Sequence, residues 1–239
     1  MAKIHLIIPA AGASSRMGQS IPKQFSSIGS KTIIEWVEYI FSNVASISSI
    51  AIAVNPNETY IENLKHHFSL KTSIYKTGGE TRSMTVLNTI NAIKDIASPD
   101  DWIMVHDASR LGVNESMINK FISDVDNHKV GGIVAIPVAD TVKRVNKSRM
   151  VIGTEDRDQI WLAQTPQMFR YKVLKKALEQ FKGVPTDECE AIESLGLQVK
   201  IFQGNINNFK VTFAEDMERI RTVFDAMNVG VMYKVMSQC

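Results

Sequence analysis

The sequence has few cysteines, almost no net charge and no long apolar run, and each shortage excludes a class of protein. Cys189 and Cys239 are the only cysteines and show no Cys-x-x-Cys spacing, so we expect two free thiols rather than a disulfide framework. The 27 basic and 25 acidic residues leave a net charge of +2, which does not suit a duplex nucleic-acid-binding protein. Without a signal-peptide pattern or a membrane-spanning apolar stretch, we expect a cytoplasmic protein with neither nucleic-acid nor membrane partners.

Motifs of the commonest nucleotide-binding and hydrolytic proteins are also missing. The loop after the first apolar run has Gly12 and Gly18 but lacks the remaining glycine of G-x-G-x-x-G. Asn55 stands where a dinucleotide fold needs an acidic residue, so a dehydrogenase is disfavoured. The chain also lacks the P-loop pattern, H-E-x-x-H and G-x-S-x-G, so neither a P-loop enzyme, a zinc protease nor a serine hydrolase is predicted.

What the sequence does contain is an alternation of strand-like and helix-like segments, which predicts an α/β fold. A mostly parallel sheet with helices on both faces follows from that order, and ligands of such sheets bind beyond the carboxyl ends of the strands. The expected strands are 4–8, 50–54, 102–105, 133–138 and 199–202, and the expected helices are 32–44, 58–68, 82–97, 114–126, 171–182 and 187–195. A last helix is expected near Thr212, where Thr212 and Glu215 fit a capping box.

Residues 140–165 interrupt this alternation with a charged segment in which polar and apolar residues alternate. The pattern predicts an antiparallel hairpin, either a solvated excursion or an arm that forms an oligomer. Because no linker or repeat divides the chain, residues 1–239 are expected to form a single domain that includes this arm.

The loop "PAAGASSRMG" (9–18) is rich in small residues, so a ligand or another part of the backbone can come close to its main chain. Ala10, Ala11, Gly12 and Ala13 carry small side chains or none, so their backbone N–H groups can reach phosphate oxygens. Arg16 and Lys23 lie seven positions apart in the following residues, close enough for both cations to bind one polyphosphate. A tight strand-to-helix turn with two surface bases is the alternative.

Three later segments favour phosphate handling. "GGETRSMT" (78–85) opens a helix with two glycines, and "NFKVT" places Lys210 before the last helix. "HDASR" puts Asp107 and Arg110 at the end of an expected strand, where a carboxylate can hold Mg²⁺ or a ribose hydroxyl. His106 alone is interpreted as a packed histidine. Basic residues beside glycine turns thus predict a site for a phosphorylated ligand.

The ordered set of short motifs resembles one family. "PAAGASSRMG", "PKQF", "GGETR", "VHDASR", "PVADTVKR", "QTPQ", "TDECEAIE" and "NFKVTFAED" follow one another from residue 9 to residue 216. In this order they are similar to the 2-C-methyl-D-erythritol 4-phosphate cytidylyltransferases of the non-mevalonate isoprenoid pathway. The resemblance implies a Rossmann-like nucleotidyltransferase fold and a homodimer that exchanges the arm 140–165. It also implies Mg²⁺ and a reaction of CTP with the sugar-alcohol phosphate that gives 4-diphosphocytidyl-2-C-methyl-D-erythritol and pyrophosphate.

Carried over position by position, the resemblance implies a role for each candidate residue. The catalytic cations would be Arg16, Lys23 and Lys210. The nucleotide would be bound by Ala10, Ala11, Gly12, Ala13, Gly79, Glu80, Thr85 and Asp107, and Asp107 would also lie beside Mg²⁺, which the CTP phosphates mainly hold. The substrate phosphate would be bound by Arg110, Lys210 and, from the arm of the partner, Thr141 and Arg157.

Two alternatives remain beside this reading. A ribitol 5-phosphate cytidylyltransferase would share the fold and the chemistry, but its opening loop is usually richer in glycine than "PAAGASSRMG". A non-catalytic nucleotide-binding relative would be expected to lack Arg16, Lys23, Asp107 or Lys210, and all four are present.

Overall fold

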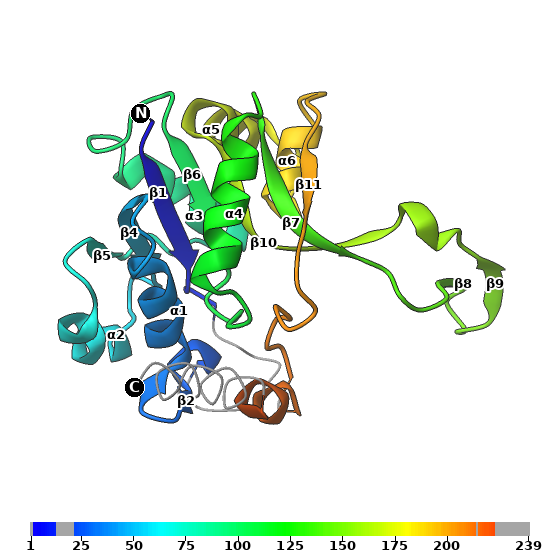
Figure 1. Ribbon diagram of the computed structural model, residues 1–239, viewed down its shortest axis with the longest axis horizontal. Coiled ribbons are helices and arrows are strands. Elements are labelled where there is room, and N and C mark those ends of the chain that lie inside the picture. The colour runs from blue at the N-terminus through cyan, green and yellow to red at the C-terminus, as the bar shows by residue number, and fades with distance from the viewer. Residues whose placement is uncertain (1, 13–21, 214, 223–239) are drawn as a thin grey trace, which may run out of the picture.

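A seven-stranded sheet forms the centre of the molecule (Figure 1). The structure is a computed structural model that describes residues 2–12, 22–213 and 215–222, so the candidate residues Ala13 and Arg16 lie outside the described residues. From one edge to the other, the strands are β11 (Lys200–Gln203), β7 (Gly131–Pro137), β10 (Trp161–Arg170), β6 (Trp102–Val105), β1 (Ile4–Pro9), β4 (Ile47–Ala53) and β5 (Thr72–Tyr75).

The strands of this sheet run parallel except for β10, which is antiparallel to both of its neighbours, β6 and β7. The expected mostly parallel α/β sheet is confirmed, and β10 is the part that the alternation of segments did not predict. The chain reaches β10 on its way back from the arm, so this strand has to enter the sheet in the opposite direction. Its position places Thr165 and Gln167 next to the carboxyl end of β6.

Helices cover both faces of the sheet (Figure 1). One face carries α1 (Ile33–Ser42), α2 (Tyr60–Leu64) and α4 (Glu115–Asp126), and the other carries α3 (Arg82–Ala92), α5 (Tyr171–Gln180) and α6 (Glu188–Glu193). Four of these helices begin at a side chain that accepts a hydrogen bond from the backbone of the first turn, as N-cap residues do. These N-caps are Thr32, Thr81, Asn114 and Asp187.

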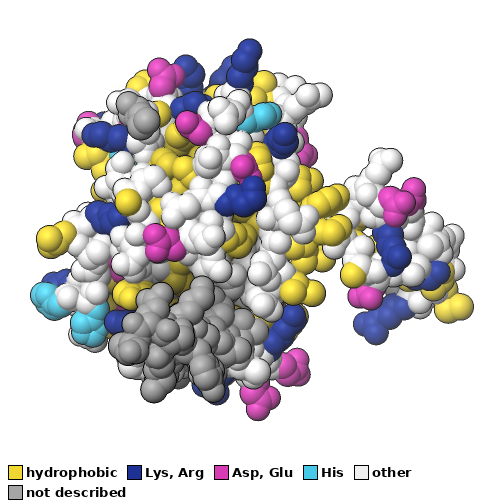
Figure 2. Space-filling model, viewed as in Figure 1, with side chains coloured by type: hydrophobic (Ala, Val, Ile, Leu, Met, Phe, Trp, Pro, Cys, Tyr) yellow, Lys and Arg dark blue, Asp and Glu magenta, His cyan; other side chains and the backbone are white. Residues whose placement is uncertain are grey.

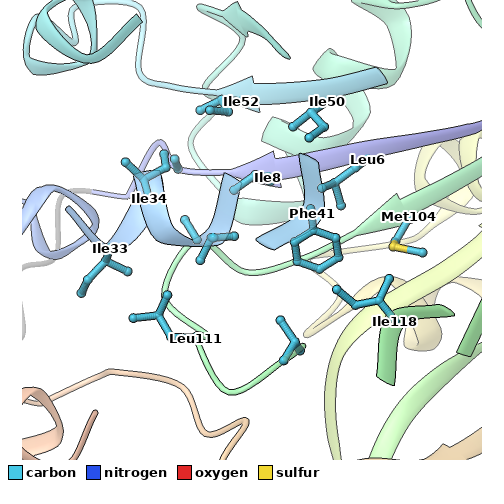
Figure 3. Packing of buried hydrophobic residues seen from close by; sticks show 14 of the residues in the cluster. Leu6, Ile8, Ile33, Ile34, Phe41, Ile50, Ile52, Met104, Leu111 and Ile118 are labelled. Atoms are coloured by element: carbon cyan, nitrogen blue, oxygen red, sulfur yellow. The ribbon is translucent and has the colours of Figure 1, made fainter. Parts of the chain in front are cut away.

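Alternating side chains of β1 divide the interior into two cores. Leu6 and Ile8 point to one face, where they pack with Phe41 of α1 and Ile118 of α4 (Figure 3). Ile7 points to the other face, toward the core formed with α3, α5 and α6. Because both faces are buried, the strand reads as a continuous apolar run.

The chain between β7 and β10 leaves the sheet as a projecting arm (Figure 1). Its outer part is the antiparallel pair β8 (Lys143–Val145) and β9 (Val151–Thr154), followed by the turn η4 (Arg157–Gln159). Figure 2 shows charged and apolar side chains together on this arm, and Val151 there is 61% exposed. The expected arm boundary at residue 165 falls inside β10, since residues 161–163 already pair with β7 in the central sheet.

Several expected elements differ from the observed ones, and the helix expected over 82–97 ends at Ala92. The helix expected over 58–68 is α2 followed by the short turn η3 (Lys65–His67). The edge strand β5 was not predicted, because its four residues are only partly buried and show no strong apolar pattern. The predicted capping pair at the last helix is wrong, since the carboxylate that accepts from the backbone N–H of Thr212 belongs to Asp216 rather than Glu215. The part of the chain that the structure describes includes no helix that is long and apolar enough to cross a membrane.

Candidate active site

Two pockets meet at the carboxyl ends of β1 and β6, the edge where the sheet topology predicts a ligand. The larger has a volume of about 610 Å³ and is lined by parts of the loops 9–12, 79–85, 107–109 and 210–212, together with Lys23, Gln24 and Asn55. The smaller, of about 260 Å³, lies against β10 and the start of α6. Arg82, Asp107 and Lys210 line both pockets, and we call these three residues the junction.

Asp107 is the acceptor on which three cations converge, two from the junction and one, Arg110, from its own loop. Its Oδ1 accepts from Nε of Arg82 at 2.9 Å. Its Oδ2 lies 2.9 Å from Nζ of Lys210 and 3.3 Å from Nε of Arg110. These cations come from α3, from the segment after β11 and from the loop after β6, so one carboxylate joins three separate parts of the chain.

The charges of the junction are set by burial and pairing together. Burial alone raises the pKa of Asp107, but the charges of Arg82, Lys210 and Arg110 outweigh it and hold this pKa well below its usual range. Burial lowers the pKa of Arg82, whereas Glu188 and Asp107 raise it above its ordinary value. Asp107 is therefore a carboxylate and Arg82 a cation at neutral pH.

His106 supports the loop that carries Asp107. Its Nε2 lies 3.0 Å from the carbonyl oxygen of Arg110, so this nitrogen donates, and Nδ1 accepts from the hydroxyl of Thr165 at 3.1 Å. The same hydroxyl accepts from the backbone N–H of Asp107 at 3.0 Å. Burial lowers the pKa of His106 to about 4, so the ring is neutral at physiological pH and is packed, as its sequence context indicated.

The described part of the opening loop, residues 9–12, lines the larger pocket together with Lys23. Lys23 donates from Nζ to the carbonyl of Val211 at 2.8 Å, which ties its side chain to the Lys210 segment. The buried amide of Gln24 donates to the carbonyls of Ala10 and Gly12 at 2.8 and 3.2 Å. The backbone N–H of Ala10 was expected to face a phosphate, but it donates to Ala53 in β4. Ala11 and Gly12 line the pocket beyond this point.

The glycine pair before α3 is required by a close approach. A Cβ on Gly78 would lie 2.7 Å from Cβ of Ala11 and 2.9 Å from Cα of Asn55, so only glycine fits without a shift of the backbone. The N–H of Gly79 donates to the hydroxyl of Thr85 at 3.0 Å, and that hydroxyl donates to the carbonyl of Thr81. Thr85 thus shapes the loop. Together with Gly79 and Glu80, it lines the larger pocket.

The expected substrate-phosphate residues divide into two groups. Arg110 lines the smaller pocket and donates from Nη1 to the carbonyl of Asn208 at 2.7 Å. Thr141 and Arg157 lie on the arm, are exposed, and line neither pocket of their own chain. Arg157 instead donates to the carbonyl of Ala139 at the base of the arm.

Several residues of the site were not singled out from the sequence, among them Gln24, Arg82, Thr165 and Glu188. Gln24 and Arg82 stand inside the recognised motifs "PKQF" and "GGETR", and Glu188 inside "TDECEAIE". Their contacts join residues far apart in the chain, such as Arg82 to Glu188 over 106 positions. The motifs that contain them were recognised, but no local pattern assigned these side chains a place in the site.

Comparison with known proteins points to one family. A sequence model of the family described as 2-C-methyl-D-erythritol 4-phosphate cytidylyltransferase matches residues 4–225. A protein of that name from Nitrosomonas eutropha is 39% identical over 221 residues, which cover 91% of this chain and 95% of the relative. Another from Thiobacillus denitrificans is 36% identical, over 95% of this chain and 99% of the relative.

Solved structures show the same architecture. A crystal structure of a 4-diphosphocytidyl-2C-methyl-D-erythritol synthase superposes with a TM-score of 0.84 at 34% identity, covering 94% of this chain and 99% of the other. The enzyme of the same family from Francisella tularensis superposes with a TM-score of 0.74 at 32% identity, covering 92% and 98%. The fold and the family resemblance predicted from the sequence are thereby confirmed. This chain belongs to the 2-C-methyl-D-erythritol 4-phosphate cytidylyltransferase family.

Proposed function

We propose that this chain transfers the cytidylyl group of CTP to 2-C-methyl-D-erythritol 4-phosphate, giving 4-diphosphocytidyl-2-C-methyl-D-erythritol and pyrophosphate. The observation that carries the proposal is the junction, since Arg82, Asp107 and Lys210 line both pockets. CTP occupies the larger pocket and the acceptor the smaller, so that the α-phosphorus and the acceptor phosphate meet at these residues. Each relative named above bears the methylerythritol name, so ribitol 5-phosphate is not favoured as the acceptor.

The reaction requires mainly that the two substrates be positioned and that the negative charge at the α-phosphorus be neutralised. An oxygen of the acceptor phosphate attacks the α-phosphorus, a new P–O bond forms, and the bond from the α-phosphorus to the β-phosphate oxygen breaks. Its electron pair leaves with pyrophosphate. Because the attacking oxygen is already ionised, no strong general base is needed, and catalysis rests on orientation and electrostatic stabilisation.

The described cations are suited to these tasks. Lys210 stands between the two pockets and Lys23 lines the larger one, so they neutralise charge at the α-phosphorus and along the triphosphate. Arg110 in the smaller pocket holds the acceptor phosphate, with Thr141 and Arg157 supplied by the arm of a second chain. Arg16 is assigned to the triphosphate by the family resemblance, and Gly79, Glu80 and Thr85 to the cytosine.

Magnesium is part of the proposal, and the donors of the site fit it. The described residues include no group of three or more acidic, histidine or cysteine side chains that would hold a metal by themselves. Mg²⁺ bound to a triphosphate needs only one or two carboxylates from the protein. Asp107 would be such a donor, with the ion replacing one of the cations that its two oxygens contact in this structure. When bound, the ion neutralises charge on the CTP phosphates.

The proposal also includes a homodimer that exchanges its arms and a cytoplasmic location. The dimer is supported by the arm, whose apolar residues Met150, Val151 and Ile152 are 65, 61 and 60% exposed. Such a surface marks a protein contact, and a partner's arm would bring Thr141 and Arg157 to a site that lacks them. The free, buried thiol of Cys189 suits a reducing compartment.

The test is pyrophosphate release with CTP, UTP, ATP and GTP, each supplied with 2-C-methyl-D-erythritol 4-phosphate or with ribitol 5-phosphate. Release only from CTP with the methylerythritol phosphate is expected, and Lys210→Ala, which removes a cation of the junction, should lose most of it. Release with ribitol 5-phosphate alone would move the enzyme to the alternative substrate. No release from folded protein with Mg²⁺ would instead favour a non-catalytic nucleotide-binding relative.

A further inference from the structure

Glu188 is a buried carboxylate to which the proposed reaction gives no role. It is the first residue of α6 and is fully buried. Its Oε1 accepts from Nη1 of Arg82 at 2.6 Å, and its Oε2 is buried without a hydrogen-bond partner among the described residues. Burial raises the pKa of Glu188, and the charge of Arg82 opposes that shift. The 2.6 Å contact with the guanidinium is that of a charge-assisted hydrogen bond to a carboxylate, so Arg82 is the group that offsets the cost of burying this charge.

Arg82 is the junction residue that contacts Glu188, and it links this carboxylate to Asp107. It donates from Nε to Oδ1 of Asp107 at 2.9 Å and from Nη1 to Glu188, while Nη2 is buried and has no partner in the described part of the chain. A guanidinium fork fits two oxygens of one carboxylate best. Here it is divided between two carboxylates instead, so each of them receives one bond.

The start of α6 is fixed independently of Arg82. Gln167 of β10, itself buried, accepts from the backbone N–H of Cys189 at 3.1 Å and donates to Oδ2 of Asp187 at 2.9 Å. The residues on both sides of Glu188 are therefore tied to the central sheet. Because the backbone around Glu188 is fixed, its carboxylate restrains the guanidinium of Arg82.

We propose that Glu188 is a positioning residue, which holds Arg82 in the divided arrangement and so leaves Oδ2 of Asp107 to Lys210 and Arg110. The proposal rests on the proposed function, because Lys210 is the cation placed there at the reacting phosphates. If the charge of Glu188 is removed, Arg82 turns a second nitrogen toward Asp107 and competes with Lys210 for Oδ2. The net positive charge beside the larger pocket also rises, so binding of anionic CTP does not weaken.

Loss of the Glu188 charge is expected to lower kcat without raising the KM for CTP, a separation that general damage to the site would not produce. In Glu188→Gln, kcat falls by about tenfold or more, the typical effect of losing a group that orients a functional side chain. The KM for CTP stays within about threefold of its original value or falls, because the added positive charge favours the triphosphate. The matched control is Glu193→Gln, the same change on an exposed residue of the same helix, which should leave both constants unchanged.

The experiment measures kcat, KM for CTP and thermal unfolding for the wild type, Glu188→Gln, Arg82→Gln, the double variant and the control. Because Glu188 acts through Arg82, the double variant should lose no more kcat than Arg82→Gln alone. A folded Glu188→Gln with normal kcat would overturn the proposal, as would losses that multiply in the double variant. An inactive wild type would count against the proposed function instead. A crystal structure of Glu188→Gln then tests this inference without turnover, since Arg82 should have left its divided arrangement, and an unmoved Arg82 would contradict it.

Discussion

The Nζ atom of Lys210 lies 2.9 Å from Oδ2 of Asp107, so a lysine from the segment after β11 meets a carboxylate from the loop after β6. Both residues line both pockets. The contact holds the flexible lysine stem at the point where the two anionic substrates of the proposed reaction approach each other. Pre-arranged positive charge at that point is worth more than the same charge recruited from solution.

Replacing Lys210 by alanine is expected to lower kcat by about a hundredfold, or about 3 kcal/mol of transition-state stabilisation. Binding of CTP should weaken much less, because Lys23 and the loop 79–85 keep their contacts in the larger pocket. Steady-state kinetics and calorimetric titration with CTP measure the two effects separately. Equal losses in both would mean that Lys210 only binds substrate. Lys200→Ala, a change of an exposed lysine on β11, serves as the control.

Burial of His106 predicts a pH dependence of stability. Its pKa is about 4 in the folded protein against an ordinary 6.5, so the unfolded chain binds the proton more readily. Stability from this group is therefore complete above about pH 6.5 and falls as the pH drops toward 4, by up to about 3 kcal/mol. Denaturant unfolding of the wild type and of His106→Gln between these pH values measures it. The variant should lose less stability on acidification, and equal losses would refute the assignment.

Part of the site was predictable because the topology brings certain loops together. Asp107 follows an apolar strand, and Lys210 follows the expected strand near 200, so parallel strands deliver both to one edge of the sheet. Arg82 was not predictable as a junction residue, since its place depends on Glu188 and Asp107, to which nothing local in the sequence connects it. The direction of β10 was missed for a similar reason, because a strand that returns from a projecting arm looks like part of that arm.

The roles of individual backbone groups in the opening loop could not be predicted from the sequence either. Small residues at 10–13 were expected to offer backbone N–H groups to phosphate, but the N–H of Ala10 continues the ladder between β1 and β4. Gln24 holds the carbonyls of Ala10 and Gly12. Which backbone groups remain for a ligand depends on these tertiary hydrogen bonds, and composition alone does not reveal them.

Gly78→Ala is expected to damage the larger pocket without touching a charged residue. The added Cβ would lie 2.7 Å from Cβ of Ala11 and 2.9 Å from the carbonyl oxygen of Val54, so the loop has to move. Such overpacking costs about 1–3 kcal/mol of folding stability, and the KM for CTP should rise. Gly153→Ala is the control, because its Cβ would meet nothing within 4 Å. An unchanged KM in Gly78→Ala would show that the close approach does not shape the pocket.

If the arm completes the site of a partner, two inactive variants should restore activity when mixed. Lys210→Ala leaves the arm intact, and Arg157→Ala leaves both pockets intact. Half of the randomly exchanged dimers are mixed, and each has one complete site, so about a quarter of wild-type activity is expected. Light scattering and tagged-subunit capture verify the exchange. Verified mixed dimers without activity would mean that Arg157 serves its own chain.

The most direct test of the account is to follow oxygen atoms through the reaction. The substrate 2-C-methyl-D-erythritol 4-phosphate is labelled with ¹⁸O in its phosphate and is incubated with CTP, Mg²⁺ and enzyme. The products are then separated, and their masses are measured by mass spectrometry. Because the acceptor phosphate attacks the α-phosphorus, we predict that all of the label stays in the CDP-linked product and that an equimolar amount of unlabelled pyrophosphate forms. Label in the pyrophosphate, or formation of CMP in place of the CDP-linked product, would contradict the account.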